Sequence, residues 1–213
     1  MYKICYYFLL FFIYSILGWI LEVIRRSIIE KRFVNRGFLI GPYCPIYGIG
    51  VLLITKLLQN YMNNFLVLFI LSMTICIVLE YLTSYFMELI FKARWWDYSG
   101  YRFNINGRVC LETAIPFGIG GLIIMYFINP LFIGILNKMP VKFLIILSIV
   151  LMSLFVVDLI ISFLIILKFR NIGIKSMRDN TEEMNKIVKE YLIKNSRCTK
   201  RLVISFPNFK IKI

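Results

Sequence analysis

Four polar residues lie within long apolar segments, where such side chains are costly. Glu80, Ser84 and Glu88 follow one another at intervals of four residues, so on a helix they share one face. Counted inward from Phe91, Glu80 lies about 16 Å deep and Glu88 about 5 Å deep. Asp158 lies at a similar depth in a later apolar segment. A charge at the bilayer centre costs about 2.5 to 3.5 kcal/mol, so we expect these deep carboxyls to be protonated, hydrogen-bonded or facing a polar cavity.

Two interpretations of Glu80 and Asp158 follow. In one, each is a protonated carboxyl that is hydrogen-bonded to a neighbouring helix and serves only the structure. In the other, each lines a transport pathway or binds a ligand. We favour the second interpretation because intramembrane ionisable residues usually serve function.

A second group of ionisable residues lies at the ends of apolar segments and in the adjoining loops, where pairing requires no deep desolvation. It comprises Glu22, Glu88, Glu112, Arg36, Arg94 and Arg108. Arg36 and Arg108 flank glycines, and a guanidinium fork suits carboxylate or phosphate. The group therefore predicts either an ion-pair lattice or a polar site for a substrate headgroup or anion.

Asx residues in the loops complete the candidate set. Asp97, Asn104 and Asn106 could cap turns, the commoner duty of such residues in glycine-containing loops. Asn35 precedes Arg36 in the first basic loop. We keep all four as candidate substrate contacts.

The composition excludes several classes of chemistry. The chain has 213 residues, 60% of them hydrophobic and only 17% charged, too few to cover a water-soluble globule. It contains no histidine, which removes His-ligated metals and Ser-His-Asp triads. Its five cysteines are scattered and form no CxxC pair, so we expect no metal site, no cofactor and no catalytic set. The formal net charge of +14 then points to membrane orientation and anionic lipid rather than to nucleic acid.

The apolar segments predict an all-α polytopic membrane helix bundle with about five transmembrane helices. They cover 4–24, 46–58, 65–91, 111–128 (extending as far as 136) and 143–167. The second is short for a roughly 30 Å hydrocarbon core, so the Gly/Pro stretch before it either dips into the bilayer irregularly or kinks the span.

Basic residues predict the orientation of these spans. With the N-terminus outside, the inner side receives 21 of the 25 Lys and Arg residues and the outer side only 4. We therefore expect a multi-pass membrane protein with an outer N-terminus and a cytoplasmic C-terminus. Residues 1–168 would form the transmembrane domain and 169–213 a basic cytoplasmic tail, with an amphipathic helix starting near Asn180.

An internal repeat emerges when the sequence is shifted by seventy residues. The coinciding pairs are Phe33/Phe103, Gly37/Gly107, Tyr47/Phe117, Gly48/Gly118, Ile49/Ile119 and Gly50/Gly120. Both copies start outside and return from inside, so we predict a parallel repeat of helical hairpins, about 4–58 and 65–128. Small residues in the return helices would let backbones approach closely.

Three loop motifs stand out: NRGFLIGPYCPIYG at 35–48, WWDYS at 95–99 and FNING at 103–107. They resemble a bacterial membrane family, the CmpB-like type IV ABC transporter permeases, over about residues 8–167. The resemblance implies a permease subunit that works with a separate ATPase. The sequence has no Walker-type phosphate loop, as such a subunit would not need one. It also lacks a recognisable Glu-Ala-Ala coupling loop, a departure that bears on how an ATPase would couple.

The leading functional hypothesis is a non-enzymatic transport component, with substrate passing between the two repeats. One alternative is a membrane-embedded enzyme acting on a lipid-linked substrate at the cytoplasmic face, using a carboxylate beside Arg36 and Arg108. Another is a membrane sensor or scaffold that uses the basic tail. The expected partners are the lipid bilayer and a separate ATPase subunit, homo-oligomerisation is left open, and nucleic acid is not expected.

Overall fold

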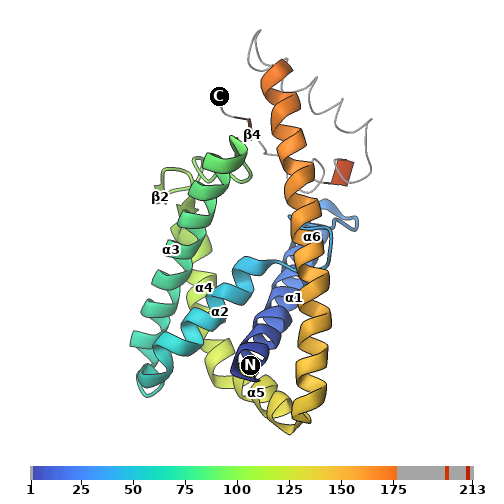
Figure 1. Ribbon diagram of the computed structural model, residues 1–213. Coiled ribbons are helices and arrows are strands. Elements are labelled where there is room, and N and C mark those ends of the chain that lie inside the picture. The colour runs from blue at the N-terminus through green and yellow to red at the C-terminus, as the bar shows by residue number, and fades with distance from the viewer. Residues whose placement is uncertain (1, 177–199, 202–209, 212–213) are drawn as a thin grey trace.

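The computed structural model describes residues 2–176, 200–201 and 210–211, and the described chain is mostly helical (Figure 1). The α-helices are α1 (Tyr2–Glu30), α2 (Pro45–Leu58), α3 (Phe65–Phe91), α4 (Leu111–Ile123), α5 (Asn129–Lys138) and α6 (Val141–Ser176). A 3₁₀ turn (Gln59–Tyr61) follows α2, and a π-helical segment (Ile124–Ile128) joins α4 to α5. Four two-residue strands complete the order: β1 (Ala93–Arg94), β2 (Asn104–Ile105), β3 (Val109–Cys110) and β4 (Lys210–Ile211).

Four helical stretches are long and apolar enough to cross a membrane: Tyr2–Glu30, Phe65–Phe91, Leu111–Lys138 and Val141–Leu167. Their outward side chains are apolar. On α6, for example, Ile146 is 63% exposed and Leu154 is 61% exposed. Exposed aliphatic side chains along a whole helix suit a lipid environment. The prediction of an all-α, multi-pass membrane protein is confirmed.

The second predicted span differs from the others. Helix α2 has only 14 residues, about 21 Å at 1.5 Å per residue, so it is too short to cross the bilayer alone. It begins at Pro45, whose missing N–H is tolerated in a first helical turn. The Cys44 N–H donates to the carbonyl oxygen of Ser15, 2.8 Å away and near the middle of α1. The chain therefore returns halfway along α1 as irregular backbone before α2 begins. That the Gly/Pro stretch dips into the bilayer stays a prediction.

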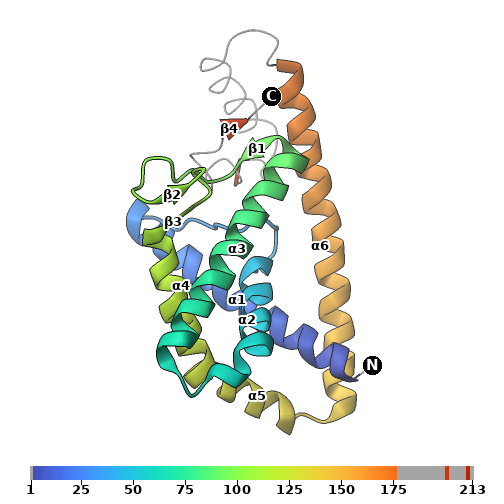
Figure 2. The same ribbon diagram turned by 90° about the vertical axis from the view of Figure 1, so that its left-hand side faces the viewer.

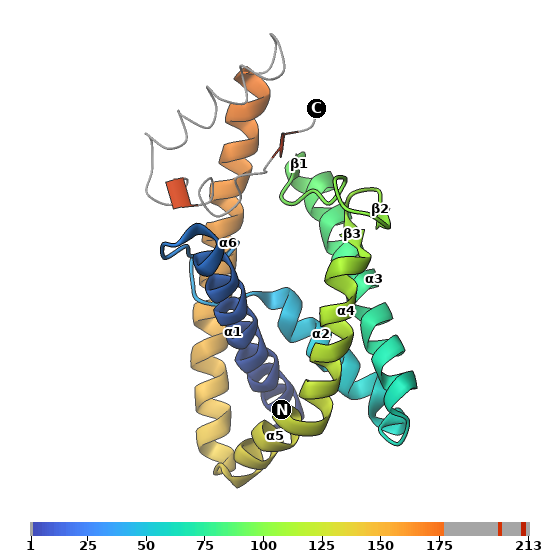
Figure 3. The same ribbon diagram turned by 180° about the vertical axis from the view of Figure 1, so that it is seen from behind.

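The helices form two antiparallel hairpins. We call α1, residues 31–44 and α2 the first hairpin, and α3, residues 92–110 and α4 the second hairpin. Figures 1 and 3 show α1 and α6 on one side, α3 and α4 on the other, and α2 between them. Figure 2 shows α6 standing beside the bundle along its whole height.

Small residues allow close helix contact within each hairpin. A Cβ added at Gly48 would lie 2.4 Å from the carbonyl oxygen of Phe11, and one added at Gly121 would lie 2.4 Å from Cβ of Ser72. Ser15 and Ser72 are fully buried at these contacts. The repeat-related rings of Tyr47 and Phe117 touch each other, with centroids 6.5 Å apart. These contacts support the predicted repeat, which stays a prediction.

Asn129, at the start of α5, fastens the helical continuation of the second hairpin to both helices of the first hairpin. It is 4% exposed and follows the π-helical segment. Its side-chain oxygen accepts from the Tyr14 hydroxyl at 3.0 Å, and its amide nitrogen donates to the Thr55 hydroxyl at 2.9 Å. Pro130 follows and cannot donate a helical hydrogen bond, a common cause of altered helix winding.

The tail lies mostly outside the described residues, as does the helix predicted near Asn180. Its described part includes β4, which pairs antiparallel with β1, Ala93 opposite Ile211 and Arg94 opposite Lys210.

Candidate functional site

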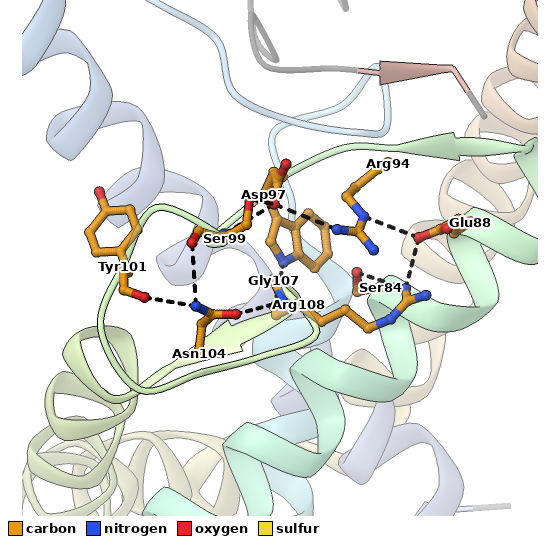
Figure 4. A network of polar contacts seen from close by, with 10 residues as sticks. Ser84, Glu88, Arg94, Asp97, Ser99, Tyr101, Asn104, Gly107 and Arg108 are labelled. Carbon is orange, nitrogen blue, oxygen red and sulfur yellow. Dashed lines mark hydrogen bonds and ion pairs between the residues drawn. The ribbon is translucent and has the colours of Figure 1, made fainter.

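Glu88 forms the centre of an ion-pair network between α3 and the loop that follows it (Figure 4). Its carboxylate lies 3.2 Å from Arg94 Nε and 3.0 Å from Arg108 Nη1. Arg108 is 9% exposed and also lies over the rings of Tyr81 and Tyr85, 5.7 and 5.4 Å from their centroids. The same guanidinium donates to the Ser84 hydroxyl at 3.4 Å. The predicted helical face of Ser84 and Glu88 thus receives an arginine from the loop.

The loop itself is held by Asx residues (Figure 4). Asp97 accepts from the backbone N–H and the hydroxyl of Ser99, and it lies 3.5 Å from Arg94 Nη1. The side-chain oxygen of Asn104 accepts from the Gly107 N–H at 3.0 Å. Gly107 has φ +65°, and a Cβ there would lie 2.7 Å from Asp97 Oδ1, so only glycine fits without strain.

Asn106 points from this loop to α3. Its φ of +53° lies in the left-handed region that asparagine tolerates better than most residues. Its amide nitrogen donates to the Tyr81 hydroxyl at 3.0 Å. Asp97, Asn104 and Asn106 therefore shape and anchor the turn.

Glu22 is the corresponding carboxylate of the first hairpin. It lies 3.4 Å from Arg36 Nε and 3.6 Å from Arg25 Nη2, and it accepts from the Tyr47 hydroxyl at 2.7 Å. The neighbouring Asn35 accepts from the indole N–H of Trp19 at 2.9 Å. Each hairpin therefore pairs a glutamate on its first helix with an arginine from its returning loop.

Asp158 of α6 holds the irregular part of the first hairpin. Its carboxylate accepts from the backbone N–H groups of Ile40 and Gly41 at 3.1 and 2.8 Å. It also accepts from the Ser162 hydroxyl at 2.9 Å and from the Tyr43 hydroxyl. Both oxygens are thus engaged, and an acceptor is supplied to backbone groups that a lipid environment would leave unsatisfied.

Arg201, from the tail, contacts the same loop. Its guanidinium donates to the carbonyl oxygen of Leu39 at 2.7 Å and to that of Ile40 at 3.3 Å. The loop therefore receives an acceptor from α6 and a donor from the tail.

Glu80 differs from every other candidate carboxylate. It lies near the middle of α3 and is 8% exposed. Oε1 accepts from the Tyr98 hydroxyl at 3.2 Å, whereas Oε2 is buried with no hydrogen-bond partner. Burying such an oxygen unsatisfied is costly, which marks the position as more than structural filling.

Glu80 also faces the first hairpin. It interacts electrostatically with Glu22 and Arg25 of α1, and Tyr98 interacts with the same two groups. Burial, together with the nearby Glu80 carboxylate, raises the pKa of Tyr98 above its usual range, so its hydroxyl stays protonated and able to donate. We call Glu22, Arg25, Tyr47, Glu80 and Tyr98 the interhairpin cluster.

Glu112 stands apart from the other candidates. It lies exposed in the first turn of α4 and, within the part of the chain that the structure describes, forms no ion pair. A carboxylate at a helix N-terminus is favourable through the helix dipole alone. Within the same residues, no group of three or more His, Cys, Asp or Glu side chains could hold a metal ion.

Sequence reasoning missed Tyr47, Tyr98 and Arg25 as members of the cluster. Tyr98 belongs to the WWDYS motif and Tyr47 to the long first motif, so their positions in the motifs were the available signal. Nothing in the sequence says that Tyr98 folds back to the middle of α3 or that Tyr47 reaches Glu22 on the preceding helix.

Comparison with known protein families gives a match over most of the chain. A family model described as "Putative ABC-transporter type IV" matches residues 9–163, from the first third of α1 into the second half of α6. No curated protein and no solved structure matches the chain.

Proposed function

Because this chain belongs to the type IV ABC-transporter family, we propose that it is the membrane-embedded permease component of a transport system. The sequence has no Walker-type phosphate loop, so a separate ATPase subunit would supply the energy. The four long apolar helices suit the role of a membrane component.

The interhairpin cluster is the observation that carries the proposed pathway. Glu80 is a buried carboxylate with one unpartnered oxygen, and it faces Glu22 and Arg25 of the other hairpin. A polar group buried between two separately packed hairpins is expensive unless it meets a ligand. We therefore place the substrate path along the contact between the hairpins, at the level of Glu80.

For Asp158 we favour the structural interpretation of a deep carboxyl over the pathway interpretation. Its two oxygens are satisfied by the loop of the first hairpin and by Ser162. We assign it a structural role, and we assign the pathway role to Glu80 alone.

The enzyme alternative receives less support from the loop carboxylates. Glu88 is engaged by two arginines, and Asp97 by Ser99 and Arg94. An acid or base must exchange protons freely with a substrate, which such pairing opposes. These residues fit a network that positions the loop against α3.

Thiol labelling tests the pathway. In a variant that lacks the native cysteines, Tyr47→Cys and Tyr98→Cys should react with a small polar thiol reagent, and a transported substrate should slow the reaction. Ile146→Cys, on the outward face of α6, is the matched control and should stay unreactive in the membrane. Equal unreactivity at all three positions would refute a path between the hairpins.

Coupling to an ATPase needs its own measurement. The purified chain, reconstituted in vesicles with an ATPase that co-purifies with it, should raise the rate of ATP hydrolysis. The same ATPase with empty vesicles is the control. If no ATPase co-purifies and none is stimulated, the permease assignment fails even where the cysteines are labelled.

A further inference from the structure

The unpartnered oxygen of Glu80 requires a ligand that can reach a side chain only 8% exposed. An anion would be repelled by the negative charge of the carboxylate. A metal ion needs about four or more ligands, and no group of three or more metal-binding side chains gathers in the described residues. A proton needs no ligand besides one carboxylate oxygen, and it is small enough to reach a buried side chain.

The groups around Glu80 come from several elements. On α1 they are Glu22 and Arg25, on the loop before α4 it is Tyr98, and on α3 itself it is Cys76. The Tyr47 hydroxyl of α2 is occupied by Glu22. The one acidic residue of α4, Glu112, lies exposed, and Asp158 of α6 is occupied by the loop of the first hairpin. Among the residues that the structure describes, Arg25 is therefore the basic side chain whose charge acts on Glu80.

Of the two arginines paired with Glu22, Arg25 is better able to move than Arg36. Its side chain is 55% exposed and lies 3.6 Å from Glu22, a loose contact. Glu22 does not depend on it, because Arg36 Nε lies 3.4 Å away and the Tyr47 hydroxyl donates at 2.7 Å. Arg25 can therefore leave Glu22 without stranding a buried charge.

We propose that Glu80 is a proton-binding site between the hairpins, and that Arg25 exchanges between Glu22 and Glu80 as the proton binds and leaves. With the proton bound, Glu80 is a neutral acid and Arg25 stays with Glu22. When the proton passes to water, the Glu80 carboxylate attracts Arg25 and draws α1 toward α3. The inference rests on the proposed function for its role in transport, but proton binding can be measured without transport.

Infrared titration of the purified, full-length protein in detergent tests the site. We expect a protonated-carboxyl band that disappears as pH rises and is missing in Glu80→Gln. Glu112→Gln, which alters an exposed glutamate, is the control and should keep the band. A wild-type band unchanged in Glu80→Gln, or no titrating band at all, would overturn the proposal.

A second variant tests the exchange of Arg25. Arg25→Gln removes the cation that favours the ionised form, so the band's midpoint should rise by about one pH unit. Arg32→Gln is the matched control, because Arg32 is exposed and paired with Glu30, and it should leave the midpoint unchanged. An equal midpoint in wild type and Arg25→Gln would rule out the exchange.

Tyr98→Phe keeps the test decisive if Glu80→Gln fails to fold. It removes the hydroxyl that donates to Glu80 Oε1 while keeping the ring, so the midpoint should again rise. An unmoved midpoint would show that the titrating group is not Glu80. Because these measurements use no ATPase and no substrate, they can fail while the permease assignment stands, and the reverse also holds.

Discussion

The two hairpins differ in how the backbone hydrogen bonds of their loops are satisfied. Each must bring its chain back along its first helix through a loop, and each pairs a glutamate on that helix with a loop arginine, Glu22 with Arg36 and Glu88 with Arg108. The second loop satisfies much of its own backbone through Asx side chains. The first loop depends on a carboxylate from α6, Asp158.

The difference follows from composition. Residues 92–110 contain Asp97, Asn104 and Asn106, which can accept from nearby backbone N–H groups. Between Gly37 and Pro45 the first loop contains no Asx, Ser or Thr residue, so its backbone donors need an acceptor from elsewhere. In the first loop only Asn35 accepts from a backbone N–H, that of Gly37, so the stretch from Phe38 to Cys44 depends on a distant helix, whereas the second loop has Asx acceptors at both ends of its turn.

The largest effect on stability is expected when the first loop loses the carboxylate of Asp158. Asp158→Ala removes the acceptor for two backbone N–H groups and the Tyr43 hydroxyl, and hydrogen bonds to a charged group contribute about 1.5 to 3 kcal/mol each. We expect the free energy of unfolding to fall by about 3 kcal/mol, which should lower the midpoint of thermal unfolding in detergent. Asp97→Ala, in the second loop, is the matched comparison and should cost less. Equal losses would show that the loops do not differ in this way.

Removing the glutamate of each hairpin sharpens the comparison. In Glu88→Gln two largely buried arginines each lose their ion pair with Glu88, although Arg94 keeps its contact with Asp97. In Glu22→Gln one of the two paired arginines, Arg25, is half exposed. Uncompensated buried charge is strongly destabilising. We therefore expect the free energy of unfolding to fall by about 2 kcal/mol in Glu88→Gln and by about 1 kcal/mol in Glu22→Gln. Chemical or thermal unfolding of both variants under one condition decides the order, and a reversed order would contradict it.

The fold was more predictable from sequence than the site. Apolar segment lengths predict the long helices, and the shortness of the second segment predicts its irregular start, because both depend on local composition. The contact of Asp158 with Gly41 spans 117 residues, and that of Tyr43 with Asp158 spans 115. Such partners depend on how α6 packs against α1, which no local pattern specifies. The same holds for Tyr98, whose motif predicts a loop but not its reach to Glu80.

Glycine substitutions probe the packing inside each hairpin. Gly48→Ala would place Cβ against the backbone oxygen of Phe11, which cannot rotate away, whereas Gly121→Ala meets the small side chain of Ser72. Overpacking lowers the free energy of unfolding by about 1 to 3 kcal/mol. We expect the loss in Gly48→Ala to lie near the upper end of this range and the loss in Gly121→Ala near the lower end. Gly120→Ala is the control, because nothing lies within 4 Å of its Cβ position, and thermal midpoints of the three variants should follow this order.

The smallest effect on stability is expected at Glu80, the one deep carboxyl that the fold does not use fully. In Glu80→Gln the side-chain oxygen still accepts from Tyr98, the size is kept, and no charge has to be buried. We therefore expect the free energy of unfolding, measured by thermal unfolding, to change by less than about 1 kcal/mol. Transport in reconstituted vesicles should nevertheless be lost, because an amide cannot bind and release a proton. Asp158→Asn makes the opposite prediction: an amide retains one acceptor where the loop presents several donors, so stability falls and any loss of transport follows from misfolding. If Glu80→Gln were as unstable as Asp158→Asn, or fully active, the two deep carboxyls would both be structural, and the contrast between them would not hold.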